Sequence, residues 1–384
     1  MKAPAGPSTR RELVGRVALA GLGLAVGLLL CEALLRVQGY RPERPRPRYR
    51  VTNAKTLKER AGALVLDCYR DDPRSYFDID LRRSADQARY AGEGVQGLAL
   101  AARDYPLCVE FRYNSAGYRD VEFGPRRPGL VRIAVVGDSF TEGQGVRAAD
   151  TLARVLEHRL AERHSGQVEV LNYGRRGADL PALSHIFQEA LAGDPDLIVY
   201  AMVLNDGVRS PEFERAWPKL NDWIMVRRPE LALGPLDSRL AALVADQLET
   251  RRIDRLTRAW YRGMYDSENA EGWRLTRHHL HEMKERAAAK GAESLVLLWP
   301  LLVGLDGHYP FEELHARLAR VCARERLAFH DALQALRGRN SRSLWAHPGD
   351  LHPNEEAQRL VVEDVLPTVE RLLAKRWADV AQPH

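Results

Sequence analysis

From residue 131 to near the end of the chain, short apolar runs alternate with amphipathic segments. Largely apolar strands are typical of a parallel sheet that helices cover on both faces, because neither face of such a strand meets water. The alternation predicts a three-layer αβα fold with a doubly wound parallel sheet, whose ligands bind at the carboxyl ends of the strands. The expected strands are 131–136, 168–172, 196–203, 294–299 and, with a weaker pattern, 327–330; the expected helices are 147–164, 179–192, 275–290, 311–325 and 354–375.

Two stretches do not follow this alternation. Residues 206–274 are too long for a simple connection within the main domain, 131–376, so we expect a helical insertion there. Residues 51–130 carry few periodic signals, and we expect an irregular flap or small subdomain that leads into the main sheet. The insertion also holds six tryptophans and tyrosines, and its tryptophans more often belong to a core than to a ligand platform: Trp217, Trp223, Trp260, Tyr261, Tyr265 and Trp273.

The amino terminus contains a run, Val17 to Leu35, that is apolar apart from Glu32. As a helix this run spans about 28 Å, close to the hydrocarbon thickness of a bilayer. Bulky residues follow it where a signal peptide would have a small-residue cleavage site. We therefore expect a basic leader at 1–16, an uncleaved single-span anchor at 17–35 and an Arg/Pro linker at 36–50. A buried core helix is the less favoured alternative, because little else in the chain is so apolar.

Composition excludes several classes of function. The formal net charge is only +5 and the arginines are spread along the chain, which argues against a nucleic-acid-binding stripe. The sequence contains no P-loop, and its four cysteines stand alone rather than in metal-binding pairs. We expect neither a cofactor nor a metal. Cys68 and Cys108 are candidates for one disulfide, which would require a compartment outside the cytoplasm.

Four short motifs occur where strands end or the last helix begins. Gly137-Asp138-Ser139-Phe140 follows the first strand, and Asn172-Tyr173-Gly174-Arg175-Arg176-Gly177 follows the second. Leu204-Asn205-Asp206 follows the third, and Asp350-Leu351-His352-Pro353-Asn354 precedes the last helix. Because the carboxyl ends of parallel strands meet at one edge of a sheet, we expect these motifs to converge.

This order of motifs resembles the SGNH (GDSL-type) hydrolase family over residues 110–375. The four residues that name the family correspond here to Ser139, Gly177, Asn205 and His352. The resemblance implies a flavodoxin-like SGNH fold and an esterase or lipase that acts through a serine nucleophile. It also implies an acyl or acetyl ester as substrate, from a small molecule, a glycan or a lipid.

The residue types agree with such chemistry. A serine hydroxyl is a weak nucleophile until a base such as histidine removes its proton, which suits Ser139 and His352. Attack on an ester creates an oxyanion that needs positioned donors. The N–H groups of Ser139 and Gly177 and the amide of Asn205 could supply them, and glycine at 177 permits a close backbone approach.

The third member of a triad is less certain from the sequence. The family usually has an aspartate three residues before the histidine, but that position is Gly349 here. Asp350, two residues before His352, is our candidate for the orienting acid. The sequence leaves open whether Asp350 completes a triad or a Ser–His dyad operates. We interpret the nearby His330, Asp331 and His347 as structural or as supports for the catalytic residues.

Each motif also has an ordinary interpretation. Ser139 could cap a helix, Asn205-Asp206 could form a turn, and His352 could be a structural histidine. Their joint order favours the catalytic interpretation. Three functions remain open: an ester hydrolase, an O-acyltransferase with the same acyl-enzyme, and an inactive carbohydrate- or lipid-binding module that uses the same cleft.

The resemblance and the basic leader, with Lys2, Arg10, Arg11 and Arg16, favour a cytoplasmic amino terminus. The catalytic domain would then lie outside the cytoplasm, in the periplasm if the host has two membranes. The arginines between residues 36 and 50 oppose this orientation by the charge rule, and contacts with anionic lipid headgroups could offset that effect.

Overall fold

A computed structural model describes residues 7–40, 61–62, 64–69, 76–80, 107–217, 237–347 and 350–380. These residues form two compact units. The first contains residues 7–40 and 237–257, and the second contains the rest. Parts of the predicted leader and linker, and Trp223 of the predicted insertion, lie outside the described residues.

The second unit is built on a five-stranded parallel sheet, which confirms the predicted fold class. Its strand order is β5-β4-β6-β7-β8. The chain moves from β4 to β5 in one direction and then returns to β6 on the other side of β4, so the switch point of the doubly wound sheet is at β4. The strands are β4 (Val131–Gly137), β5 (Val168–Gly174), β6 (Leu197–Met202), β7 (Glu293–Leu298) and β8 (Ala328–Asp331).

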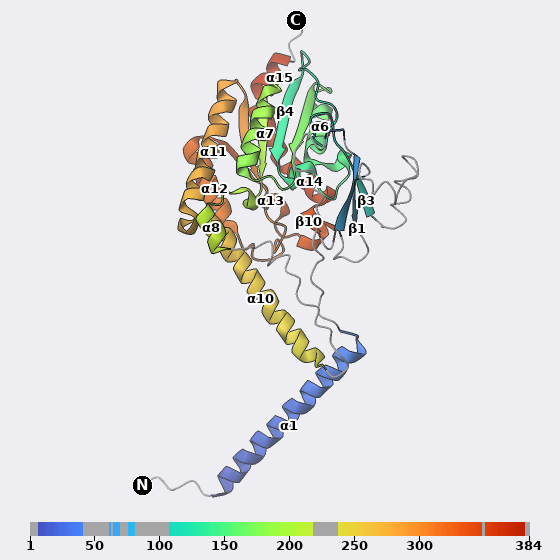
Figure 1. Ribbon diagram of the computed structural model, residues 1–384, viewed down its shortest axis with the longest axis vertical. Coiled ribbons are helices and arrows are strands. Elements are labelled where there is room, and N and C mark those ends of the chain that lie inside the picture. The colour runs from blue at the N-terminus through green and yellow to red at the C-terminus, as the bar shows by residue number, and fades with distance from the viewer. Residues whose placement is uncertain are drawn as a thin grey trace. The chain divides into compact units, whose positions relative to one another are not determined.

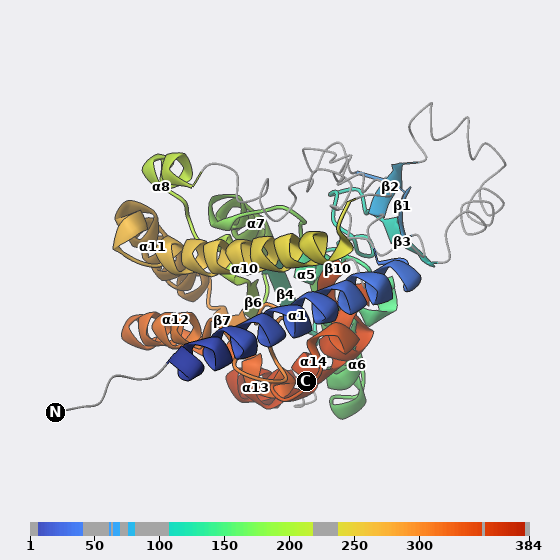
Figure 2. The same ribbon diagram turned by 90° about the horizontal axis from the view of Figure 1, so that it is seen from below.

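Helices cover both faces of this sheet. Figure 2 shows α7 (Leu180–Ala192) and α11 (Ala270–Ala289) on one face, and α6 (Leu152–Arg163) and α14 (Glu355–Leu372) on the other. Both faces of β4 and β6 are buried, as their continuous apolar runs predict. The remaining helices of this unit are α5 (Ser139–Glu142), α8 (Pro211–Ala216), α12 (Glu312–Glu325), α13 (Leu333–Leu336) and α15 (Ala374–Val380), with 3-10 turns at Ala148–Asp150, Leu204–Asp206, Ser267–Asn269 and Ser341–Leu344.

Residues 51–130 differ from the expected irregular segment. Their described part forms a three-stranded antiparallel sheet in the order β2-β1-β3. The strands are only five or six residues long, so no periodic pattern marked them. They are β1 (Leu64–Tyr69), β2 (Tyr76–Asp80) and β3 (Leu107–Arg112). The register pairs the backbone of Cys68 with that of Cys108. Antiparallel partners lie about 4.5–5.5 Å apart at Cα, within the range of a disulfide. The side chains of these two cysteines lie outside the described part, so the disulfide stays a prediction.

The first unit contains α1 (Pro7–Val37) and the start of α10 (Arg239–Met264) (Figure 1). Of the described helices, α1 alone is long and apolar enough to cross a membrane, by length and composition, over the 27 residues Arg11–Val37. Glu32, the acid in this run, accepts hydrogen bonds from the backbone N–H groups of Arg239 (2.9 Å) and Leu240 (2.8 Å). A carboxylate at a helix amino terminus pairs with N–H groups that have no partner inside the helix. This explains an acid in an otherwise apolar segment.

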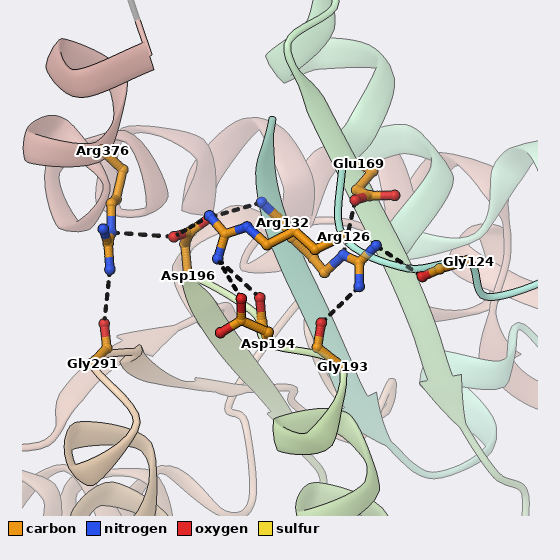
Figure 3. Close-up of polar contacts among 9 residues, drawn as sticks. All are labelled: Gly124, Arg126, Arg132, Glu169, Gly193, Asp194, Asp196, Gly291 and Arg376. Atoms are coloured by element: carbon orange, nitrogen blue, oxygen red, sulfur yellow. Dashed lines mark hydrogen bonds and ion pairs between the residues drawn. The ribbon is translucent and has the colours of Figure 1, made fainter. Parts of the chain in front are cut away.

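A buried ionic network fixes the amino ends of the central strands (Figure 3). Asp196, just before β6, has a fully buried side chain that accepts hydrogen bonds from Arg126 Nη2 (2.8 and 2.9 Å) and from the backbone N–H of Arg132 (2.9 Å). Arg376 pairs with the same carboxylate at 3.1 Å. Arg132 also pairs with Glu169 of β5 at 2.8 Å. The network therefore joins β4, β5, β6 and α15 at the edge opposite the carboxyl ends of the strands.

Replacing Asp196 with alanine should lower the free energy of unfolding by about 2–4 kcal/mol, because the Arg132 N–H and two arginines lose their buried acceptor. Asp194→Asn is the matched control, because the backbone of Asp194 is left-handed (φ +54°), a conformation that asparagine adopts readily and that alanine would strain. Asp194 is 69% exposed and also pairs with Arg126, so its loss should cost about 0.5 kcal/mol or less. Chemical denaturation of the detergent-solubilised chain, followed by circular dichroism, measures both changes. Equal losses for the two variants would contradict this account of the network.

Candidate active site

Ser139 lies at the carboxyl end of β4, where the strand turns directly into α5. The Asp138 carboxylate accepts a hydrogen bond from the backbone N–H of Phe140 at 2.9 Å and so caps this short helix. The cap is therefore Asp138 and not Ser139, which the ordinary interpretation had in that role, and Ser139 is the first residue of the helix. In Figure 1 the arrow of β4 points toward the end of the unit where β10 (Asp350–Pro353) lies.

His352 reaches Ser139 from β10, at the far end of the sequence. Its Nε2 atom lies 2.8 Å from Ser139 Oγ. The Phe140 ring packs edge-on against the imidazole, with ring centroids 5.4 Å apart. On α14, Gln358 donates from Nε2 to the Phe140 carbonyl at 3.1 Å. These contacts fix the short helix that carries the serine relative to the strand that carries the histidine.

Asp350 binds the other side of the imidazole. Its Oδ1 atom contacts His352 Nδ1 in a short hydrogen bond, and it also accepts the backbone N–H of His352 at 3.1 Å. In a strand, residues i and i+2 point to the same face, so an acid two positions before the histidine can reach the ring. This geometry places the proton on Nδ1 and leaves Nε2 to accept the proton of the serine hydroxyl.

Gln144 is a site residue that the sequence analysis missed. Its Nε2 atom donates to Asp350 Oδ2 at 2.9 Å, so the oxygen that does not face His352 is also held. Gln144 follows Ser139 closely in the chain, but it lies 206 residues from Asp350. Only the folded chain brings the two together, and no local pattern marks the contact.

Two of the three candidate oxyanion donors, those other than Ser139, follow the strands on either side of β4. Gly177, after β5, has a left-handed backbone with φ +73°, and a Cβ there would meet nothing within 4 Å. Glycine is therefore required for the backbone conformation rather than for lack of space. Asn205 lies in the turn after β6, and its Nδ2 atom donates to Asp138 Oδ2 at 3.3 Å. The cap of α5 thus also orients the Asn205 amide, a second role for Asp138 that its position in the motif did not reveal.

Buried acids surround the Asn205 turn. Burial raises the pKa of Asp138. Burial, together with nearby Asp138, raises the pKa of Asp206 well above its usual range. Asp206 holds the turn by accepting hydrogen bonds from Tyr200 Oη (2.9 Å) and the Val203 N–H (3.0 Å). A raised pKa favours the neutral carboxyl, which reduces the negative charge that a developing oxyanion would face.

The other histidines and acids near these loops make different pairs. His330 Nε2 contacts Asp364 of α14 at 2.7 Å, and Asp331 contacts His315 at 2.8 Å. His347 lies in β9 (Trp345–His347), which pairs with β10. Neither His330 nor Asp331 takes part in the Ser139–His352–Asp350 arrangement, in agreement with their structural interpretation. Among the described residues, no group of His, Cys, Asp and Glu has a geometry that could hold a metal.

Comparisons with known proteins address the same region. The sequence model of the GDSL-like Lipase/Acylhydrolase family matches residues 135–360. The crystal structure of TesA is 20% identical in sequence. The match covers 63% of this chain and 99% of the TesA chain, with a TM-score of 0.39. A lipolytic protein of the G-D-S-L family from Veillonella parvula is 15% identical, and the match covers 63% of this chain and 100% of that protein's chain, with a TM-score of 0.37. A lipase/acylhydrolase from Enterococcus faecalis is 15% identical, and the match covers 63% of this chain and 96% of that protein's chain, with a TM-score of 0.39. A search of curated proteins found no match.

The contacts of His352 predict a pH dependence for the reactivity of Ser139. Burial lowers the pKa of His352, but the Asp350 carboxylate more than offsets this, and the pKa is raised above the usual 6.5. A base must be neutral to accept the serine proton, so phosphonylation of Ser139 by a fluorophosphonate should increase with pH, with a midpoint above 6.5. Asp350→Asn should move the midpoint to lower pH and reduce the plateau rate by at least about 100-fold.

Asp364→Asn is the matched control, since it makes the same change at the His330–Asp364 pair. Its midpoint and plateau should equal those of the unmodified chain. If Asp350→Asn leaves both the midpoint and the plateau unchanged, Asp350 is not the orienting acid and a Ser–His dyad operates.

Proposed function

The chain belongs to the GDSL-like lipase/acylhydrolase family and is therefore an esterase or lipase of the SGNH type, and we propose that it hydrolyses its ester through an acyl-enzyme formed on Ser139. The observation that carries this proposal is the 2.8 Å contact between Ser139 Oγ and His352 Nε2, with Asp350 on the opposite nitrogen. A nucleophile, a base and a group that orients the base are the elements this chemistry requires.

In the first half of the reaction, Ser139 Oγ attacks the ester carbonyl carbon while His352 Nε2 takes the hydroxyl proton. The carbonyl oxygen becomes an oxyanion and accepts hydrogen bonds from the N–H groups of Ser139 and Gly177 and from the Asn205 amide. His352 then gives its proton to the departing alcohol oxygen, and the acyl group remains on Ser139. Asp350 keeps the ring oriented and stabilises the imidazolium that forms.

Water completes the second half. It gives a proton to His352, attacks the acyl carbon and displaces Ser139, which recovers its proton from the imidazolium. A sugar or another alcohol in place of water would make the protein an O-acyltransferase. The site residues serve both outcomes equally. The ratio of hydrolysis to transfer with added alcohol acceptors separates the two functions.

Ser139→Ala should reduce turnover of p-nitrophenyl esters by at least about 1,000-fold, because no acyl-enzyme can form and only binding and the oxyanion donors remain. The temperature of thermal unfolding should be nearly unchanged, because the substitution removes only a hydroxyl and the helix is still capped by Asp138. A series of esters from acetate upward, assayed on the same preparation, measures the preferred acyl length. Near-normal turnover by the alanine variant would overturn the mechanism, and an inactive but folded unmodified chain would favour the binding-module alternative.

We further propose that α1 is an uncleaved anchor, with the catalytic unit outside the cytoplasm and in the periplasm of a host with two membranes. The same length and composition fit a cleaved signal sequence. The contacts of α1 support retention. Glu32 accepts the first N–H groups of α10, and Arg36 Nη2 donates to the Asp237 carbonyl at 2.9 Å. Cleavage after α1 would remove both side chains and leave α10 without these partners.

The proposed topology predicts that an alkaline phosphatase fused to the carboxyl terminus is active, and that a reporter requiring the cytoplasm is inactive at the same position. Mass spectrometry of the fusion from membranes should also find peptides from residues 11–36, which cleavage would remove. The opposite pattern of reporter activity would place the catalytic unit in the cytoplasm. A mature amino terminus after residue 36 would show that α1 is a signal sequence.

A further inference from the structure

Glu142 is a fully buried acid that the mechanism above does not use. It is the last residue of α5, three positions after Ser139, and its side chain is 0% exposed. Its Oε1 atom accepts a hydrogen bond from Tyr113 Oη at 2.5 Å, and its Oε2 atom accepts the backbone N–H of Arg176 in a short hydrogen bond. The Arg176 guanidinium also pairs with Oε1, at 3.4 Å from Nε. A buried carboxylate is costly unless several donors surround it, and these donors come from two distant segments.

One of those donors lies directly before a proposed oxyanion donor. Arg176 precedes Gly177, and the loop that holds both is bonded to the nucleophile segment at two further points. The Arg175 N–H donates to the Gly137 carbonyl at 2.9 Å, and Asn172 Nδ2 donates to the Thr141 carbonyl at 3.0 Å. These two bonds fix the start of the loop. The bond from the Arg176 N–H to Glu142 holds the residue directly before Gly177.

The other donor comes from a segment that precedes the whole sheet. Tyr113 follows β3, and Arg119 of the same segment donates to the Glu142 carbonyl (3.2 Å) and the Gly143 carbonyl (2.6 Å). The Arg119 and Arg176 guanidinium groups both lie over the ring of buried Phe111, with Cζ 3.5 and 4.4 Å from its centroid. Residues 111–119 therefore contact both the nucleophile helix and the loop before Gly177.

We propose that Glu142 is a positioning residue for the oxyanion hole. It fixes the Arg176 peptide, and thereby aims the next N–H, that of Gly177, at the oxygen that becomes negative. Tyr113 and Arg119 hold Glu142 in turn, so the segment after β3 is part of the active-site scaffold rather than a flap over it. The inference rests on the proposed ester hydrolysis and assigns a role to a residue outside the Ser–His–Asp arrangement.

Glutamine at position 142 cannot replace the carboxylate. An amide has one acceptor oxygen and one NH₂ group, whereas Arg176 approaches both carboxylate oxygens with donors, its backbone N–H at Oε2 and its guanidinium at Oε1. Either orientation of the amide therefore places NH₂ against one donor of Arg176. The loop must shift, and displacements of about 1 Å in a catalytic group can cost about 100-fold in rate.

The test compares Glu142→Gln with Glu169→Gln, measured on the full chain in detergent with p-nitrophenyl acetate. Glu169 is also a largely buried acid paired with an arginine, but it lies at the amino edge of the sheet. We expect Glu142→Gln to lower kcat by about 10- to 100-fold with KM within about twofold, because the lost contact acts on the transition state. The midpoint of the pH profile should stay in place, since His352 and Asp350 are untouched. Glu169→Gln should lower thermal stability without changing kcat.

A folded Glu142→Gln variant with kcat within twofold of the unmodified chain would overturn the proposal. So would a shift of the pH midpoint like that expected for Asp350→Asn, because Glu142 would then act through the base. If Glu142→Gln does not fold, Tyr113→Phe provides the test, since it removes only the hydroxyl that donates to Glu142. We expect this variant to lose at least about threefold in kcat at constant KM. An unchanged kcat would overturn the proposal. An inactive unmodified chain would instead contradict the proposed hydrolysis itself.

Discussion

The close approach of the nucleophile helix to the end of β5 is the constraint on which the site depends. A Cβ on Gly174 would lie 2.1 Å from the backbone nitrogen of Glu142, so no other residue fits without moving the helix. The pairing of β4 with β5 continues to Gly137 and Gly174, so the Arg175 N–H reaches the Gly137 carbonyl, and the loop leading to Gly177 begins beside Ser139. The serine and its neighbouring donors are thus positioned by backbone packing, before any catalytic side chain contributes.

The buried ion pairs that stabilise the sheet lie at its amino edge, and the candidate catalytic residues lie at its carboxyl edge. At the amino edge, buried Asp196 and the arginines around it join three strands and α15 (Figure 3). At the carboxyl edge, the buried acids Asp138 and Asp206 have raised pKa values and hold the loops that carry Ser139 and Asn205.

The sequence predicted the parts of this protein that depend on local pattern. All five strands of the main sheet follow from apolar runs. Ser139 was singled out by a motif after the first of these strands, and His352 by a motif before the last helix. The sequence named Asp350 as the candidate orienting acid but left its contact with His352 open. A two-residue spacing brings the acid to the ring only in a strand, and the strand at Asp350–Pro353 is too short to leave a pattern in the sequence. Gln144 and Tyr113 were missed for another reason: their partners, Asp350 and Glu142, are distant in the chain.

The central claim is that Ser139 carries the acyl group during turnover. Rapid mixing with a p-nitrophenyl ester, followed by an acid quench and peptide mass spectrometry, tests it most directly. The account predicts a burst of about one p-nitrophenol per active site and an acyl mass increment on the peptide that contains Ser139. An acyl group on a different residue would contradict it. So would turnover by folded protein, under conditions where deacylation is rate-limiting, with no acyl group found on Ser139.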